Sequence, residues 1–183
     1  MVTTFVPISS FTFSLNAKKN NNYVEKNSTE ENKPLKFIPF DEFNAKNYFN
    51  VDKSNNNFIL EGFNLDKKSD IKESIDTNGY NALFIPDYVT SIVGLNESIG
   101  IGAFQYAFSN DSTKSEYVSN QITAIIFESD SICSSVGKYC FSHCDSIDFV
   151  GLSNSITSLG DHCFADCLSL STVLLSKNLK TIP

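Results

Sequence analysis

The chain has 183 residues, 41% of them apolar, and a formal net charge of −7, with lysine as its only strongly basic residue type. This apolar content excludes a wholly disordered chain, and the length suffices for one ordinary domain or two small ones. Arginine is the usual bidentate reader of phosphate and guanine, so its absence argues against a nucleic-acid partner. No run of 18 apolar residues occurs, so we expect no membrane-spanning helix in this sequence.

The first part of the chain, residues 1–64, is rich in Asn and Lys. Residues 1–15 carry Pro7 and lack a basic region ahead of their apolar stretch, so no signal peptide is recognisable. Residues 11–15 alternate like a strand, whereas residues 17–34 are polar and predict a mobile loop. We therefore expect a small, mostly β N-terminal region that is partly disordered.

A change in composition follows. Residues 65–79 (LDKKSDIKESIDTNG) are polar and end in turn-forming residues, which predicts a linker. All five cysteines lie at or after Cys133. We therefore expect residues 80–183 to form a separate domain.

Two consecutive segments of that domain repeat each other. Residues 135–157 align with residues 158–180 without gaps, which gives a period of 23, and nine of the 23 positions are identical. Two earlier copies appear once insertions near residues 93–98 and 109–120 are allowed. The sequence thus predicts about four repeats, and we expect the second insertion, which is mainly polar, to project from them as a loop.

Each copy reads as a short apolar strand, a polar turn and a G-x-x-C-F-x-x-C segment, with Ala at both Cys positions in the earlier copy. One such unit cannot bury its own apolar residues, whereas stacked units bury each against its neighbour. We therefore predict an α/β repeat solenoid with parallel strands on one face and short helical turns on the other. Its structural core would be a ladder of Phe104, Phe141 and Phe164 flanked by Cys140, Cys144, Cys163 and Cys167.

The segment IPDYVTSI at residues 85–92 and the two copies of G-x-x-C-F-x-x-C resemble the BspA-type leucine-rich repeat family over residues 80–183. The chain departs from the family pattern at its two insertions and at Ser153, which replaces the proline. The resemblance implies a curved leucine-rich repeat solenoid displayed at the cell surface or secreted. It also implies a protein ligand, such as a host or matrix protein, and it brings no catalytic residues.

The cysteines and His143 and His162 form the only candidate metal or enzyme site. Zinc sites favour pairs of cysteines two residues apart, whereas these pairs have the spacing C-x-x-x-C. Ala103 and Ala107 occupy the equivalent positions of the earlier copy, which favours a slot for a small buried side chain. We therefore expect no catalytic residue, metal or cofactor, with a disulfide between stacked coils and a metal site as the remaining alternatives.

Strand alternation places a second set of apolar side chains on the outer face of the predicted sheet. This outer stripe consists of Phe84, Ile126, Phe149 and Leu174. A contiguous exposed apolar row marks an interface, which favours a binding or adhesion module, although the N-terminal region could also cover the row. The alternatives are a purely structural repeat segment of a larger surface protein and a Cys-dependent enzyme.

The repeat pattern stops within a unit. Ile182 matches Leu159 of the preceding copy, but the Gly and Phe that should come next are missing after Pro183. No polar capping unit closes the stack. We therefore expect the sequence to be a fragment of a longer repeat protein.

Overall fold

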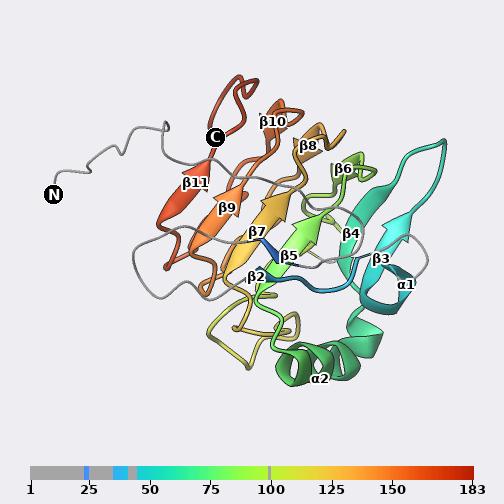
Figure 1. The fold of residues 1–183 in the computed structure, drawn as a ribbon, viewed down its shortest axis with the longest axis vertical. Helices are drawn as coiled ribbons and strands as arrows, with labels where there is room; N and C mark the ends of the chain where they lie inside the picture. Colours follow the sequence, from blue (N-terminus) through green and yellow to red (C-terminus); the bar gives the residue numbers. More distant parts are fainter. Residues whose placement is uncertain (1–22, 25–34, 41–44, 99) are drawn as a thin grey trace, which may run out of the picture.

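The computed structural model describes residues 23–24, 35–40, 45–98 and 100–183. The strand predicted at residues 11–15 and most of the loop predicted at residues 17–34 lie outside these ranges. From residue 80 onward the described chain winds into stacked coils (Figure 1), of which the first three contribute one strand to each of two sheets and the last contributes β11 to the first sheet.

The first sheet contains the four longer strands of the repeats. In spatial order these are β11 (Thr172–Leu174), β9 (Phe149–Gly151), β7 (Ala124–Phe127) and β5 (Ala82–Ile85). All neighbouring pairs are parallel, and Phe149 pairs with Thr172, one period of 23 residues further on. The prediction of a parallel sheet with one strand per repeat is therefore confirmed.

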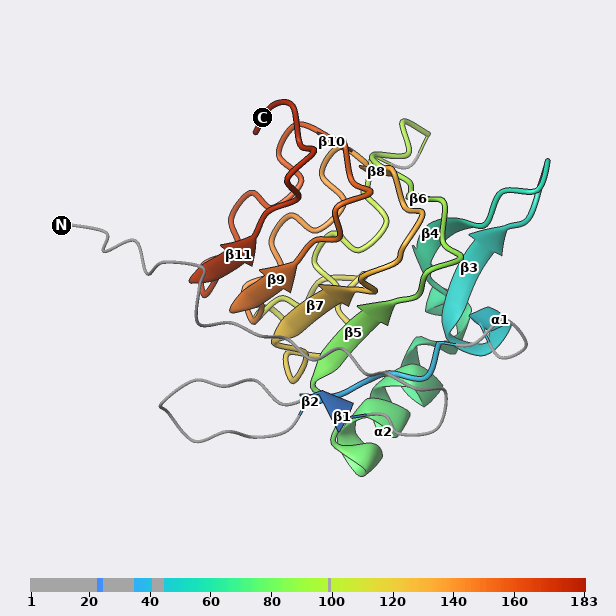
Figure 2. The same ribbon diagram turned by 45° about the horizontal axis from the view of Figure 1, so that its top comes forward.

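A second sheet lies above the first in Figure 2 and joins the repeats to the N-terminal region. Its repeat strands are β6 (Ser91–Ile92), β8 (Ser135–Val136) and β10 (Ser158–Leu159), all parallel. Next to β6 lies β4 (Ile59–Phe63), also parallel, and β3 (Phe49–Asp52) pairs with β4 in the antiparallel direction. The N-terminal region thus continues a sheet of the repeats, which the sequence analysis did not anticipate.

The remaining N-terminal elements are short, and two of them are helices. The strands β1 (Tyr23–Val24) and β2 (Leu35–Lys36) pair with each other, and α1 (Ala45–Tyr48) precedes β3. After β4 come a 3₁₀ turn, η2 (Leu65–Lys67), and the helix α2 (Lys68–Asn78).

Helix α2 occupies the segment that we expected to be a linker, so that expectation is corrected. Ile71 and Ile75 are fully buried, and Gly79 ends the helix in the left-handed conformation with its N–H donated to the carbonyl of Ile75. The two isoleucines are four residues apart and therefore lie on one face of the helix. These two buried side chains are enough to pack an otherwise polar helix against the core.

Turns, not helices, form the third side of the coils. The described part of the repeat region contains no helix, so the prediction of short helical turns is wrong. Tyr139 and His143 have left-handed φ angles of 55° and 57°, which interrupt a helical path. The backbone instead bonds to the next coil, because Phe141 and His143 donate their N–H groups to the carbonyls of Cys163 and Ala165, each at 2.8 Å.

The phenylalanine ladder forms the centre of one continuous core. The Phe104 and Phe141 rings stack with centroids 5.1 Å apart, and the Phe141 and Phe164 rings at 5.5 Å. Phe104 and Phe141 are buried, whereas Phe164 in the last coil is half-buried. Phe63 of β4 lies 5.3 Å from Phe104, so the core continues into the N-terminal region.

The first insertion leaves the stack directly after Gly94 and rejoins it at Gly102. Gly94 packs on Gly137, because a Cβ built on Gly137 would lie 2.0 Å from the Gly94 nitrogen. Gly100 lies within the loop, at a left-handed φ of 73°. The loop is closed at its neck, where Asn96 donates its N–H to the carbonyl of Ile101 at 2.9 Å.

The second insertion packs against α2 and does not project freely, which corrects that expectation. Tyr117 and Val118 within it are buried. The Nζ of Lys68 on α2 donates to the carbonyl of Ser115 at 3.0 Å, and Gln121 at the end of the insertion donates its Nε2 to Asp76 at 2.8 Å. This loop therefore joins the repeats to the N-terminal region a second time.

Candidate functional site

The cysteine cluster has the geometry of packing groups. All five thiols are free, and four of them are buried, with Cys167 half-buried in the last coil. The thiol of Cys144 donates to the carbonyl of Phe104 at 3.2 Å, and that of Cys167 to the carbonyl of Phe141 at the same distance. Each of these thiols therefore donates a hydrogen bond to the preceding coil. Ala107, at the equivalent position of the earlier copy, cannot make such a bond.

Burial also keeps these thiols protonated. Desolvation raises the pKa of Cys163 to about 12 and that of Cys167 to about 11, and it raises the pKa values of Cys140 and Cys144 well above the usual range. The thiolate is the nucleophilic form of cysteine and the form that binds metal. These four thiols are therefore poor candidates for catalysis or for zinc.

The two histidines lie in different columns of the stack. The His143 ring stacks on Tyr106 at 4.4 Å between centroids, and the His162 ring on Tyr139 at 4.9 Å. His143 also approaches the Asp166 carboxylate, with 3.6 Å between Nε2 and Oδ2. Within the described ranges, no three His, Cys, Asp or Glu residues are grouped so that they could hold a metal ion.

The outer stripe exists as a cluster of side chains but does not offer an open surface. Ile126 and Phe149 are only 5% and 4% exposed, and Phe84 and Leu174 are half-buried against them. Leu35 and Phe37 of the N-terminal region join this cluster, and the Phe37 ring lies 5.3 Å from Phe84. The expectation of an exposed binding stripe is therefore corrected, because these apolar side chains form a second small core.

The pairing register explains how the stripe stays continuous. Phe84 pairs with Ile126, Ile126 with Gly151 and Gly151 with Leu174, so Phe149 is not in the same row. A Cβ built on Gly151 would lie 3.3 Å from Cε1 of Phe149. The Phe149 ring thus fills the space above the glycine and completes the row.

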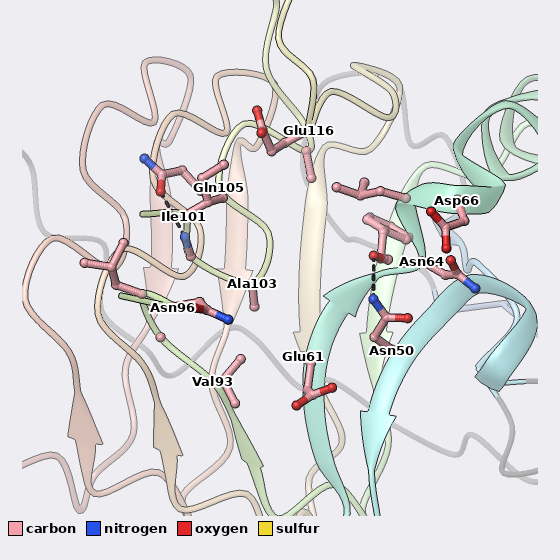
Figure 3. Close-up of a pocket in the computed structure, with 16 residues that line it drawn as sticks. Asn50, Glu61, Asn64, Asp66, Val93, Asn96, Ile101, Ala103, Gln105 and Glu116 are labelled. Carbon is pink, nitrogen blue, oxygen red and sulfur yellow. Dashed lines mark hydrogen bonds between the residues drawn. The ribbon is translucent and has the colours of Figure 1, made fainter. Parts of the chain in front are cut away.

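A hollow with a volume of about 520 Å³ lies between the N-terminal region and the first coil (Figure 3). The N-terminal region contributes Asn50, Glu61 and residues 63–66. The first insertion contributes residues 93–96, with residues 101–103 continuing the wall, and the second insertion contributes Glu116. Pockets of 300 to 1,000 Å³ are typical of ligand sites.

Neutral polar groups hold the walls of this hollow in place. Gln105 accepts the N–H of Gly102 at 3.0 Å, Asn96 accepts that of Ser98 at 2.9 Å, and Asn50 donates to the carbonyl of Phe63 at 3.4 Å. Sequence analysis did not find this site, because its walls come from segments far apart in the chain. The only signal in the sequence was the pair of insertions, which both line it.

Comparison with protein families decides the nature of the repeats. The family described as the BspA-type leucine-rich repeat region, with six copies, matches residues 113–183. Residues 113–183 are a BspA-type leucine-rich repeat region. BspA-type repeats are generally protein-binding repeats and are common in surface proteins. The coil that begins at β5 precedes the matched range but pairs with β7 in the same parallel register.

Two further findings concern the chain as a whole and its described helices. Comparison with the curated proteins and with the solved structures gave no match. Among the described residues, no helix is long and apolar enough to cross a membrane.

Proposed function

We propose that the chain is a non-enzymatic protein-binding module, in which BspA-type repeats form a solenoid and the hollow beside the first coil contacts the partner. One observation carries this proposal: both insertions that depart from the 23-residue period line the same hollow. In repeat proteins, insertions tend to map to one face, which is often the binding face. Loops held by a rigid scaffold are also where binding residues concentrate.

The setting that fits this module is a cell-surface or secreted adhesion protein, with a host or matrix protein as its partner. This part of the proposal rests on the family, whose members are generally surface repeats. The raised thiol pKa values and the packing of Phe141 and the cysteines support a structural rather than a catalytic use of the repeats.

A second candidate function is a purely structural segment of a larger surface protein. The burial of the outer stripe favours it, since that face offers no open apolar surface for a partner. The two candidates differ in one respect: only the binding module needs the hollow.

The test compares variants of two exposed surfaces. Leu65 and Asn96 line the hollow and are exposed, so Leu65→Ser with Asn96→Ala should leave the fold intact. Ile132, which is 59% exposed and lies outside the hollow, provides the control Ile132→Ser. We expect surface plasmon resonance against a panel of purified matrix proteins to find a ligand that the double variant loses and the control keeps. Equal binding by all three proteins would favour the structural role.

A further inference from the structure

The hollow carries charge of one sign. Glu61 from β4, Asp66 from η2 and Glu116 from the second insertion line it, and no lysine belongs to its described lining. None of the three carboxylates forms an ion pair with another described residue. Glu116 accepts a hydrogen bond from the neighbouring Ser115 hydroxyl, a neutral donor that leaves its charge in place.

The positions of these three carboxylates indicate which kind of ligand fits the hollow best. In Figure 3, Glu116 lies at one end of the hollow, Glu61 at the other and Asp66 to one side, so they do not converge on one point. No metal-binding group of three was found among the described residues. A neutral sugar could bond to the amides of Asn50 and Gln105 but would leave three carboxylates without a counter-charge. An organic cation satisfies both the charges and the amide oxygens.

We propose that the hollow takes lysine or arginine side chains from a basic segment of the protein partner. This inference rests on the proposed function and gives its ligand a chemical class. Glu61 and Asp66 are exposed at the hollow and Glu116 is half-buried, and carboxylates form charge-assisted hydrogen bonds to ammonium and guanidinium groups that are stronger than bonds between neutral groups. The net charge of −7 adds long-range attraction for a basic partner and speeds its association.

The experiment titrates the full chain with an unstructured lysine-rich peptide by isothermal calorimetry and by amide NMR. A peptide in which glutamate replaces each lysine is the negative probe. The test variant is Glu61→Gln with Asp66→Asn and Glu116→Gln, which removes the charges and keeps the side-chain shapes. The matched control is Glu73→Gln with Asp130→Asn and Asp161→Asn, which removes the same charge from exposed residues outside the hollow.

We expect the lysine peptide to shift the amide signals of residues 93–105, and the test variant to bind it at least about tenfold more weakly. The control should stay within about twofold, because distant exposed charges are screened by salt. Equal weakening in both variants, or no binding of the lysine peptide to the native chain, would overturn the inference. A protein ligand that is lost with Leu65→Ser and Asn96→Ala but kept by the charge variant would overturn it too, while leaving the proposed function standing.

Discussion

The repeat coils and the N-terminal region are built in different ways and yet share one core. In the coils, equivalent positions stack on themselves, as Phe104, Phe141 and Phe164 do. In the N-terminal region, Phe49 and Phe63 pack through an aperiodic cluster that ends on Phe104. Within a periodic stack, each coil makes the same contacts with the next one. The first coil has no preceding coil and instead packs against the aperiodic N-terminal region.

The first and the last described coils also differ in how exposed their apolar side chains are. The first coil is covered by β4 and β3, so Phe104 and Ala107 are buried. The last described coil has no such cover in the structure, and Val173 and Leu175 are 36% and 45% exposed where Val150 and Leu152 are buried. Equivalent residues should therefore contribute unequally to stability according to which coil holds them.

The largest expected effect tests this inequality directly. Phe141 is fully buried between two stacked rings, so Phe141→Ala should lower the free energy of unfolding by about 3 to 5 kcal/mol through lost burial and a cavity. Phe164→Ala in the last coil should cost about half as much, because that ring is half-buried. Urea titration of both variants measures the difference. A loss below about 1 kcal/mol for Phe141→Ala would contradict the ladder.

The next prediction concerns the helix found where a linker was expected. Ile75→Ala on α2 should destabilise the protein by about 2 to 5 kcal/mol, because Ile75 is fully buried in the shared core. The exposed neighbour Asp76 binds Gln121, so Thr77, which is exposed, is the better control as Thr77→Ala. If chemical denaturation gives the same stability for both variants, α2 does not belong to the core.

We expect the ionisation of the thiols to make the free energy of unfolding depend on pH. Every cysteine lies in the repeats, so this effect arises from the repeats alone. Below about pH 9 the folded and unfolded chains both keep the thiol protons. Above it, the unfolded chain releases them, while Cys133 and Cys167 in the folded chain keep theirs up to about pH 11. The free energy of unfolding should therefore fall as pH rises, by about 1.4 kcal/mol per thiol for each pH unit.

A double variant isolates this effect from other titrating groups. Cys133→Ala with Cys167→Ala should remove about 3 kcal/mol of the loss seen between pH 8 and pH 10 in urea titrations. Tyrosines and lysines titrate equally in both proteins, so only the difference in slope matters. Identical slopes would mean that these two thiols ionise as readily in the folded chain as in the unfolded one.

The smallest effect concerns the contact between α2 and the second insertion. Lys68→Met keeps the aliphatic stem but removes the donor to the Ser115 carbonyl, and should cost about 1 kcal/mol. Its neighbour Lys67 is exposed, so Lys67→Met is the matched control. Hydrogen exchange should speed up at residues 114–118 in the first variant only. Unchanged exchange there would show that the insertion is held by Tyr117 and Val118 alone.

The sequence predicted the coils because their columns repeat, so that Phe141 and Phe164 fix the register that the strand pairs later display. It did not predict the second sheet, because strands of two residues such as Ser135–Val136 are too short to show alternation. The sequence did not predict helix α2, because its buried face contains only two isoleucines in an otherwise polar segment. The hollow could not be predicted at all, since Asn50 and Glu116 meet only through the tertiary fold.

Both insertions leave the stack and return to it through closed necks. Asn96 bonds to Ile101 across the first, and the N–H groups of Val118 and Ser119 both bond to the carbonyl of Ala107 across the second. The exposed residues beyond each neck can therefore be exchanged without shifting a coil, unlike Phe108 and Tyr117, which are buried. Two chains with the same frame could then display different loops and recognise different molecules, so that likeness between their repeats would be a poor guide to a shared ligand.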